Sequence, residues 1–379
     1  MQISITSLAS VSALGDSTAA AFEYTSPAHC LELLEGQDLP TWGGALPRDL
    51  KHEIEQSLEP YSSLDPSVLF AIWTTRKAVR SAGWEGHLDF GVNFGSSRGA
   101  TSLWEAHHNS FRDMGRTGSL ASPTTTLGNI ASWVAQDVRA TGPEISHSIT
   151  CSTALHALLN GIAWLESGMS PRFLVGGSEA PLTPFTIAQM KALKIYSRQN
   201  GPYPCRALDP EKANNTMVLG EGAAAACLEK GHKEGALAFI EGVGFATEPL
   251  EHGASLSAEA SCLQRSMTMA MQGVSPQQVD AVVMHAPGTL KGDRSEIRAV
   301  KRVFAGKSPA VTSNKWKIGH TLGASGLLSV EMAVLMLQKQ KFIGVPYVTG
   351  AAVPTQLRYI LVNAVGFGGN AVSILLRRP

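Results

Sequence analysis

The sequence lacks an excess of charge of either sign. Its 379 residues include 31 lysines and arginines and 31 aspartates and glutamates, so the formal net charge is zero. No block of basic residues forms the electrostatic footprint of a nucleic-acid-binding protein. We therefore expect no nucleic-acid partner. A local basic patch for an acidic protein partner stays open, because net charge does not report how charges are distributed.

Long hydrophobic runs are also missing. No uninterrupted apolar stretch approaches the roughly 20 residues that a membrane-spanning helix needs, so we expect no membrane span. The first residues, MQISITSLASVSALG, contain no positively charged segment followed by an apolar run, and we expect no signal peptide. These absences predict a soluble cytoplasmic protein.

Cysteine is sparse, with five residues in the chain. No two lie at the close spacing of a zinc knuckle or a CxxC redox motif, and an odd, sparse set is typical of a reducing compartment. The glycine-rich stretches NAVGFGGNA and GVGFAT do not fit the GxGxxG pattern of dinucleotide sites. We therefore expect neither a metal nor a tightly bound cofactor. The cysteines are Cys30, Cys151, Cys205, Cys227 and Cys262.

Short apolar runs alternate with longer segments of helical periodicity, which predicts an α/β architecture. The strands expected in the first half are Ile3–Leu8, Phe90–Gly95, Ile145–Ile149, Phe173–Gly177 and Ala223–Leu228. Those expected in the second half are Leu237–Phe245, Val279–Met284, Ala310–Ser313, Phe342–Val348, Tyr359–Asn363 and Ala371–Leu376. The two sets have similar length and rhythm, as expected if one half-domain had been duplicated, although no sequence repeat is visible.

Two predicted helices follow the residues of greatest chemical interest. Apolar residues recur at helical spacing after Cys151. The run GASGLLSVEMAVLMLQ after His320 is apolar nearly all round, which predicts a buried helix. The apolar positions of the first helix are Leu155, Leu158, Leu159, Ile162 and Leu165.

Cys151 is the first candidate for chemistry. It lies between the expected strand Ile145–Ile149 and the start of a helix, where unpaired main-chain N–H groups and the helix dipole favour an anion. This position predicts a stabilised thiolate. The alternative is a small buried cysteine that fills a tight strand–helix junction, which is the commoner role of buried cysteine.

Two histidines occupy comparable positions in the second half. His285 follows the apolar strand VDAVVM and opens HAPGTLKGD, and strand ends are where α/β folds place functional groups. His320 lies in NKWKIGHTLGASG, directly before the buried helix. Taken alone, each has a plain alternative: a surface-loop histidine for His285, and a capping or packing histidine for His320.

Other candidates surround these histidines. Lys315 and Glu296 are candidates for a buried ion pair that fixes the two histidine loops relative to each other, with ordinary surface charge as the alternative. The tail NAVGFGGNA has three glycines around Phe367, and such a turn can aim main-chain N–H groups at an oxyanion. A simple hairpin bend is the competing interpretation of the tail.

Taken in order, these stretches resemble the β-ketoacyl-acyl carrier protein synthases (ketosynthases) of the thiolase superfamily. A nucleophile motif, two histidine motifs and a glycine-rich tail in this order are highly specific, and the resemblance covers nearly the whole chain. The matching stretches are VSALG, GPEISHSITCSTA, FLVGGSEA, LGEGAAAACLE, HAPGTLKGDRSE, SNKWKIGHTLGASG and NAVGFGGN.

The resemblance implies a duplicated, thiolase-like αβαβα layered fold. Its N-terminal half, residues 1–232, would carry the nucleophile, and its C-terminal half, residues 233–379, would carry both histidines. It also implies an acyl carrier protein as partner, and a dimer that is either a homodimer or a heterodimer with a second ketosynthase-like subunit. One cysteine with two histidines looks like the elongating type, since the initiating type has asparagine in place of the second histidine. A thiolase would need a second catalytic cysteine near the C-terminus, whereas the last cysteine here is Cys262.

Catalytic roles also follow from the resemblance. Cys151 would carry the acyl group, while His285 and His320 would polarise the malonyl thioester carbonyl and stabilise the enolate left by loss of carbon dioxide. The main-chain N–H groups of Cys151 and Phe367 would form the oxyanion hole, with Phe367 also acting as a gate to the acyl tunnel. By the same resemblance, Lys315 and Glu296 would orient the histidines.

Substrate binding is the last implied property. The phosphopantetheine arm of the carrier would be the handle of the substrate, held by Thr289, and Thr124–Leu127 and Phe185–Met190 would line the acyl tunnel. The substrate-binding residues expected in this way are Thr289, Thr124, Thr125, Met190, Gly366 and Gly368.

Two departures from the family pattern stand out. Pro287 replaces the first of two threonines in the loop after His285, which removes one donor to the pantetheine. The usual arginine, aspartate, glycine and phenylalanine stretch before GEG reads EKANNTMVLGEG. We expect a specialised type II system that makes a polyene or polyketide-like chain, such as an aryl polyene or flexirubin pigment.

Two other functions compete with this one. A non-condensing chain-length factor would dimerise with a true ketosynthase and shape its tunnel, although such subunits usually lose the nucleophile. A carrier-independent acyltransferase or hydrolase would use the same thiolate without releasing carbon dioxide.

Overall fold

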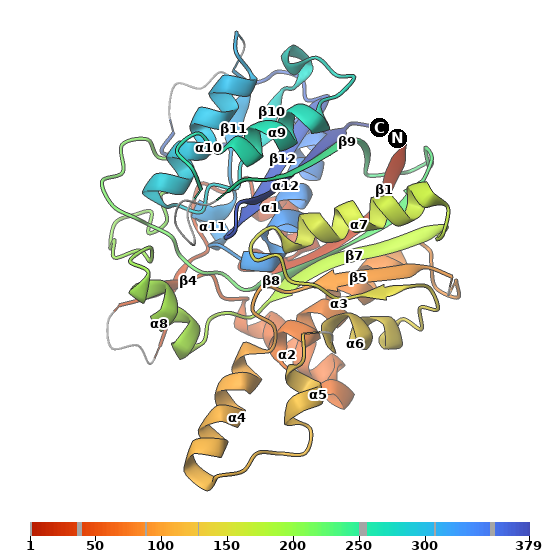
Figure 1. Cartoon of the computed structure of the whole chain (residues 1–379), viewed down its shortest axis with the longest axis vertical. Coiled ribbons are helices and arrows are strands. Elements are labelled where there is room, and N and C mark those ends of the chain that lie inside the picture. Colours follow the sequence, from red (N-terminus) through yellow and green to blue (C-terminus); the bar gives the residue numbers. More distant parts are fainter. Residues whose placement is uncertain are drawn as a thin grey trace.

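One mixed β-sheet runs through the chain and carries helices on both faces (Figure 1). The computed structural model describes residues 2–35, 40–87, 89–127, 129–249, 256–306, 308–348 and 353–379. Within these residues, eleven strands form the sheet, and β3 (Glu32–Leu33) and β4 (Trp42–Gly43) form a separate pair. The α/β prediction is confirmed.

The strands of the sheet fall into two sequential groups. Those of the first half are β1 (Ile3–Ser12), β2 (Gly15–Asp16), β5 (Gly91–Gly95), β6 (Glu144–Ile145), β7 (Arg172–Glu179) and β8 (Gly222–Lys230). Those of the second half are β9 (Ala238–Thr247), β10 (Ala281–Val283), β11 (Ala310–Thr312), β12 (Tyr359–Gly366) and β13 (Asn370–Arg377).

The two groups repeat one topology. From its edge to its centre, the first half runs β6, β5, β7, β8, β1, and the second half runs β11, β10, β12, β13, β9. In both halves the three outer strands are parallel and the two inner pairings are antiparallel. The halves join where β1 pairs with β9. The structure therefore shows the internal repeat that the strand rhythm suggested.

Helices cover the sheet in a matching way. The helices of the first half are α1 (Ser17–Glu23), α2 (Arg48–Ser57), α3 (Pro66–Ser81), α4 (Thr101–Met114), α5 (Ala121–Thr125), α6 (Asn129–Asp137), α7 (Thr153–Ser167) and α8 (Pro184–Ala192). Those of the second half are α9 (Ser261–Ala270), α10 (Leu290–Val303), α11 (Lys315–Ile318) and α12 (Ser325–Lys339). Short 3₁₀ turns cover Glu59–Tyr61, Pro276–Gln278 and Leu322–Ala324.

The two helices predicted from their apolar patterns form the centre of the molecule. Helix α7 packs on β5 and β7, α12 packs on β12, and the two helices contact each other. Leu155 and Leu158 of α7 and Leu327 and Leu328 of α12 belong to one buried core. Helices α3 and α6 pack on strands of the first half and α9 on strands of the second (Figure 1). Since α7 and α12 start near the middle, residues just before them come close together.

The predicted strand Phe342–Val348 is wrong, because this segment is a loop with a turn at Pro346 and Tyr347. Ile343 and Val345 are buried, so the apolar pattern reflects packing of a loop on the core. Pro346 lacks the N–H that a strand ladder needs. The carbonyl of Ile343 instead accepts a hydrogen bond from the Thr312 hydroxyl at 2.6 Å.

The strand before Cys151 is shorter than predicted. It covers Glu144–Ile145, after which side chains take over the main-chain hydrogen bonds. The Ser146 hydroxyl donates to the Phe94 carbonyl at 3.2 Å, and the Ile149 N–H donates to the Thr153 hydroxyl at 2.9 Å. Side-chain bonds of this kind compete with a ladder and turn the chain toward α7.

The predicted boundary between residues 232 and 233 lies in the connection between β8 and β9. The division into 1–232 and 233–379 stays a prediction. Among the described residues, no helix is both long and apolar enough to cross a membrane.

Candidate active site

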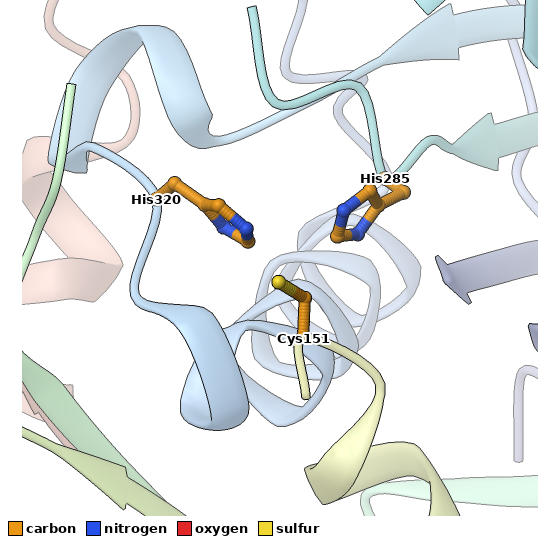
Figure 2. A group of neighbouring side chains, drawn as sticks. All are labelled: Cys151, His285 and His320. Carbon is orange, nitrogen blue, oxygen red and sulfur yellow. The ribbon is translucent and has the colours of Figure 1, made fainter. Parts of the chain in front are cut away.

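Three side chains that are distant in the sequence meet in the middle of the molecule. The sulfur of Cys151 and ring nitrogens of His285 and His320 all lie within 4.8 Å of one another. Figure 2 shows the Cys151 side chain pointing toward both imidazoles. The two imidazole rings meet edge to face, with centroids 5.1 Å apart and planes at 85°. All three side chains are buried.

The repeated topology explains this convergence. Cys151 lies two residues before α7, with Ser152 between them as the N-cap, and His320 precedes the turn Leu322–Ala324 that leads into α12. His285 follows β10, which pairs in parallel with β12. The N–H of His320 donates to the Val218 carbonyl at 2.6 Å, and the N–H of Gly220 donates to the His320 carbonyl at 3.0 Å. The stretch before β8 thus fixes the His320 loop.

Glu296 of α10 fixes the His285 loop through the main chain. Its carboxylate accepts hydrogen bonds from the N–H groups of His285 at 2.9 Å and Ala286 at 2.8 Å, and from the Asn363 amide at 3.1 Å. Burial raises the pKa of Glu296 to about 7, although these hydrogen bonds oppose the rise. The carboxylate therefore sets the position of the His285 backbone.

Lys315 does not form the predicted ion pair with Glu296. Its ammonium group is buried and donates to the Asn314 side-chain oxygen at 2.9 Å and to the Ser329 hydroxyl at 3.2 Å. Among the described residues, no carboxylate lies within 4.0 Å of it in an ion pair. Burial lowers the pKa of Lys315 to about 8, and the charge of Glu296 acts in the opposite direction. The cation thus sits close to the site, held by neutral partners.

Both histidines are neutral near pH 7. Burial lowers the pKa of His320 to about 3, and the Lys315 charge adds to this effect. Burial also holds the pKa of His285 well below its ordinary value, with His320 and Lys315 as further causes. Among the described residues, the Nδ1 atom of each ring is buried and has no hydrogen-bond partner. A neutral imidazole can accept a proton or donate a hydrogen bond.

The prediction of a stabilised thiolate at Cys151 is wrong for the resting protein. Burial raises the pKa of Cys151 to about 12, and the nearby charge of Glu179 raises it further. Lys315 and Arg98 act in the opposite direction but are outweighed. At neutral pH the side chain is therefore a thiol beside two neutral imidazoles.

Glu179 and Asn363 are site residues that sequence reasoning missed. Glu179 ends β7, and its carboxylate accepts hydrogen bonds from the N–H groups of Ser97 and, at 3.1 Å, of Gly323. Burial raises the pKa of Glu179 to about 7. Each residue lies inside a recognised stretch, Glu179 in FLVGGSEA and Asn363 in NAVGFGGN. A carboxylate at the end of a buried strand indicates a functional role for Glu179, and an amide inside a buried strand indicates one for Asn363.

A cavity of about 370 Å³ opens onto the three residues. An apolar cluster that includes Met190, Met217 and Leu322 surrounds Cys151. Thr289, Met190, Gly366 and Phe367 line the cavity, as does Pro287. Thr289 caps α10, where its side-chain oxygen accepts a hydrogen bond from the Gly292 N–H at 3.2 Å. Among the described residues the hydroxyl acts only as an acceptor, so its proton can serve a ligand.

Three predicted substrate-binding residues lie outside this lining. Thr124 and Thr125 belong to α5, and their hydroxyls donate back to the carbonyls of Leu120 and Ala121 at 2.7 Å and 2.6 Å. Gly368 lies in the turn between β12 and β13, with φ +99°. None of the three residues lines the cavity that contains Cys151. A role of Thr124, Thr125 and Gly368 in substrate binding stays a prediction.

The turn around Phe367 touches the loop before Cys151. The Thr150 hydroxyl donates to the Phe367 carbonyl at 3.4 Å. A Cβ at Gly366 would lie 1.8 Å from the Thr150 hydroxyl oxygen, so only glycine allows this approach. The contact brings the main chain at Phe367 to the edge of the cavity, beside Cys151.

Comparison with known proteins identifies the family. Residues 32–234 match the family "Beta-ketoacyl synthase, N-terminal domain", and residues 237–346 match "Beta-ketoacyl synthase, C-terminal domain". The chain is 29% identical over 344 residues to 3-oxoacyl-[acyl-carrier-protein] synthase 2 of Vibrio cholerae serotype O1, covering 83% of each protein. The chain belongs to the β-ketoacyl synthase family and is a condensing acyltransferase of the thiolase superfamily.

Solved structures have the same fold. One is "AntDE:AntF (apo): type II PKS acyl-carrier protein in complex with its ketosynthase bound to the hexaketide", with TM-score 0.86 and 20% identity. Another is "The ishigamide ketosynthase/chain length factor", with TM-score 0.87 and 17% identity. Each comparison covers 100% of this chain and 99% of the other. The predicted thiolase-like α/β fold is thus confirmed.

Proposed function

We propose that this protein elongates acyl chains by decarboxylative Claisen condensation of a Cys151-bound acyl group with malonyl-acyl carrier protein. The observation that carries the proposal is the meeting of one thiol with two neutral imidazoles at the inner end of a cavity. A thiol alone is sufficient for acyl transfer. Two hydrogen-bond donors beside it can also stabilise the enolate that forms when a malonyl thioester loses carbon dioxide.

The first step loads the acyl group. The Cys151 sulfur attacks the carrier-bound thioester, the carrier thiol leaves, and a new thioester forms on Cys151. Because burial keeps the pKa of Cys151 at about 12, its proton must leave as the carbon–sulfur bond forms. A neutral imidazole beside it is the acceptor, and the proton passes on to the departing carrier thiolate. The Lys315 charge favours the developing anion.

The second step uses the same imidazoles as donors. Malonyl thioester loses carbon dioxide, and N–H groups of His285 and His320 stabilise the enolate oxygen. The enolate carbon then attacks the acyl carbonyl on Cys151. Main-chain N–H groups of Cys151 and Phe367 hold the resulting oxyanion, each donor contributing about 3 kcal/mol. Collapse of this intermediate leaves the elongated chain on the carrier and releases the Cys151 sulfur as a thiolate, which takes up the one proton that the overall reaction consumes and returns to the thiol.

Other residues position the reacting groups. Glu296 acts through the main chain of His285, and Lys315 acts through its charge. Thr289 donates to the phosphopantetheine arm, which is the substrate handle, and no tightly bound cofactor takes part. Pro287 lines the same passage but has no hydroxyl group, so the arm has one donor fewer.

An acyl carrier protein is the proposed substrate carrier, and a second ketosynthase-like subunit the proposed partner. Solved structures of the same fold include a ketosynthase with its acyl carrier protein and a ketosynthase/chain length factor, which supports both. A chain-length-factor role is the alternative for this chain. The retained Cys151, His285 and His320 favour the condensing role. The five unpaired cysteines support a cytoplasmic location.

The departures at Pro287 and in EKANNTMVLGEG support a specialised type II pathway for a polyene or polyketide-like chain. An aryl polyene or flexirubin pigment pathway is our specific proposal. Preference for saturated chains among acyl-carrier substrates would refute it.

Acyl transfer and decarboxylation can be measured separately. We expect incubation with acyl-carrier protein to add one acyl group to Cys151, seen by intact mass and peptide mapping, and Cys151→Ala to abolish the adduct. Malonyl-carrier should then release carbon dioxide and give an elongated product. Cys151→Gln is expected to keep decarboxylation while losing elongation.

Two outcomes would redirect the assignment. A chain-length factor would form neither adduct nor product alone, and would increase the yield of an added ketosynthase. A simple acyltransferase or hydrolase would form the adduct without releasing carbon dioxide. Cysteine and histidine are also zinc ligands, so the assays are repeated with EDTA, which we expect to leave the rates unchanged.

A further inference from the structure

The loop that carries Cys151 is not held by the ladder of the sheet. Strand β6 ends at Ile145 and α7 begins at Thr153, so residues 146–152 belong to neither element. Thr150 in this loop has φ +46°, a conformation that a β-branched residue rarely adopts. Contacts outside the sheet ladder therefore set the position of the nucleophile.

The His147 side chain connects this loop to the elements on both sides of it. Its Nδ1 atom lies 2.9 Å from the side-chain nitrogen of Asn93 in β5, and its Nε2 atom lies 3.1 Å from the Thr153 carbonyl oxygen. Thr153 is the first residue of α7 and lies two residues after Cys151. The imidazole thus bridges β5 and the first turn of the helix that follows the nucleophile.

Asn93 determines which nitrogen of this imidazole carries the hydrogen. Its side-chain nitrogen donates to the Ile145 carbonyl oxygen at 2.9 Å, and its side-chain oxygen accepts from the Asn160 amide at 2.9 Å. A carbonyl oxygen can only accept, so the nitrogen of the Asn93 amide faces both Ile145 and the ring. Nδ1 must then accept, and Nε2 donates to the Thr153 carbonyl. The hydrogen-bond partners thus specify one neutral tautomer of His147.

The main chain of His147 is also fixed against β5. The Ser96 N–H donates to the His147 carbonyl at 3.3 Å. Gly95 allows this approach, because a Cβ there would lie 2.6 Å from the same carbonyl oxygen. The backbone and the side chain of His147 are therefore both anchored, four residues before Cys151.

We propose that His147 is a positioning residue, whose two side-chain hydrogen bonds hold Cys151 in place beside the two imidazoles of the site. This inference rests on the proposed acylation of Cys151 and adds a residue that the reaction needs although it does not touch the substrate. Loss of the two bonds frees the loop, and a displacement of about 1 Å at a reacting group costs about 100-fold in rate.

Two rates at Cys151 separate positioning from a purely structural role. One is loading by an acyl-pantetheine thioester, read by intact mass, and the other is alkylation by iodoacetamide at pH 7, read by peptide mapping. A displaced sulfur loads more slowly, because it no longer aligns with the imidazoles. It is alkylated faster, because burial raises the pKa of this thiol and a freed loop exposes it. The two rates therefore change in opposite directions.

Three substitutions of His147 test the hydrogen bonds. His147→Met removes both bonds, and we expect loading at least about tenfold slower and alkylation at least about threefold faster. His147→Gln keeps an acceptor and a donor at a spacing close to that of the two ring nitrogens, and both rates should stay within about threefold of the parent. His147→Asn reaches Asn93 but not Thr153, so it should resemble His147→Met, and it replaces that variant if the latter does not fold.

Ser7→Ala is the control. It also removes a buried side-chain hydrogen bond, from the Ser7 hydroxyl to the Ala78 carbonyl at 2.7 Å, but this bond links β1 to α3. Neither rate at Cys151 should change. Thermal melting and size-exclusion chromatography verify that each variant is folded and associates as the parent does.

Several results would overturn the inference. One is a folded His147→Met variant with the two rates of the parent. Another is His147→Gln with the rates of His147→Met, since the shape of the ring and not its hydrogen bonds would then matter. A changed elution volume of the His147 variants would assign the residue to a subunit contact instead. Absence of loading in the parent would refute the proposed function, while alkylation would still decide whether His147 positions Cys151.

Discussion

The Cys151 thiol experiences two opposed effects. Its place before α7 and the charges of Lys315 and Arg98 favour an anion, but burial and Glu179 raise its pKa to about 12. Burial and the Glu179 charge outweigh the helix position and the two cations, because water is excluded from the sulfur. Reactivity at neutral pH therefore depends on proton transfer to an imidazole during attack.

This balance predicts the pH profile of alkylation by iodoacetamide. The thiolate is the reactive form, so the rate at Cys151, followed by peptide mapping, should rise about tenfold per pH unit between pH 7 and 10. Glu179→Gln should increase the rate at each pH, since it removes a repelling charge. An alkylation rate that stops rising below pH 8 would mean that the helix dipole and the charges of Lys315 and Arg98 lower the pKa of Cys151 more than burial and Glu179 raise it.

Lys315 places a cation in the core without a carboxylate partner. Its pKa of about 8 lies below the ordinary 10.5, so between these pH values the unfolded chain binds more protons than the folded chain. The free energy of unfolding then rises with pH in this window, and the full cost of burial applies below pH 8. A pKa difference of this size corresponds to about 3 kcal/mol.

Lys315→Met is therefore expected to stabilise the protein at pH 7 while impairing catalysis. We expect the free energy of unfolding in urea to increase by roughly 1–2 kcal/mol, because the loss of the Lys315 hydrogen bonds offsets part of the burial cost that the substitution removes. The gain should shrink toward zero at pH 10. Lys317→Met is the matched comparison: burial lowers the pKa of Lys317 too, but its loss would leave the carbonyls of Ser26 and Ala28, which accept from it at 2.7 Å, without their donor, so it should destabilise. Destabilisation by Lys315→Met at pH 7 would contradict this account.

At the scale of elements, the site depends on how closely two loops approach. The turn after β12 meets the loop before α7 at Gly366 and Thr150. Thr150 has φ +46°, which is unfavourable for a β-branched residue. The contact therefore constrains both loops that carry the proposed oxyanion hole.

Gly366→Ala should disrupt this contact. Its Cβ would lie 1.8 Å from the Thr150 hydroxyl oxygen and 2.9 Å from the Ile149 carbonyl oxygen, so the loops must separate. We expect kcat for condensation to fall at least about 100-fold, as for loss of one oxyanion donor. Adding Thr150→Gly removes the closer clash and should restore part of the activity. Activity of Gly366→Ala equal to that of the parent would show that the loops need not touch.

The elements themselves were largely predictable from sequence, because strands and helices buried on both faces leave continuous apolar runs. The same logic failed at Phe342–Val348, where a loop packs on the core and carries an equally apolar pattern. The three central site residues were predictable because each begins or ends such a run. The pairing of Lys315 with Ser329, and of Glu296 with the main chain, depends on tertiary contacts that no local pattern encodes.

At the scale of the whole molecule, the two halves share one sheet and one core. Strand β1 pairs with both β8 and β9, and Leu155 of α7 and Leu327 of α12 are buried in the same cluster. We therefore expect a single cooperative unfolding transition for the full chain, with coincident fluorescence and circular dichroism. Residues 1–232 alone should not fold cooperatively, since β1 would lose its pairing with β9 and α7 would lose its contact with α12. Two separated transitions would indicate independent halves.

The central place of β1 has a consequence for biosynthesis. The Ser4 hydroxyl donates to the carbonyl of Gly231, 227 positions later, and β9 follows further on. During synthesis β1 thus waits for these partners until the residues through β8 and β9 have been made. Until then β1, half of whose ten residues are apolar, lacks both of the strands that flank it in the sheet, and long-range closure of this kind is intrinsically slow.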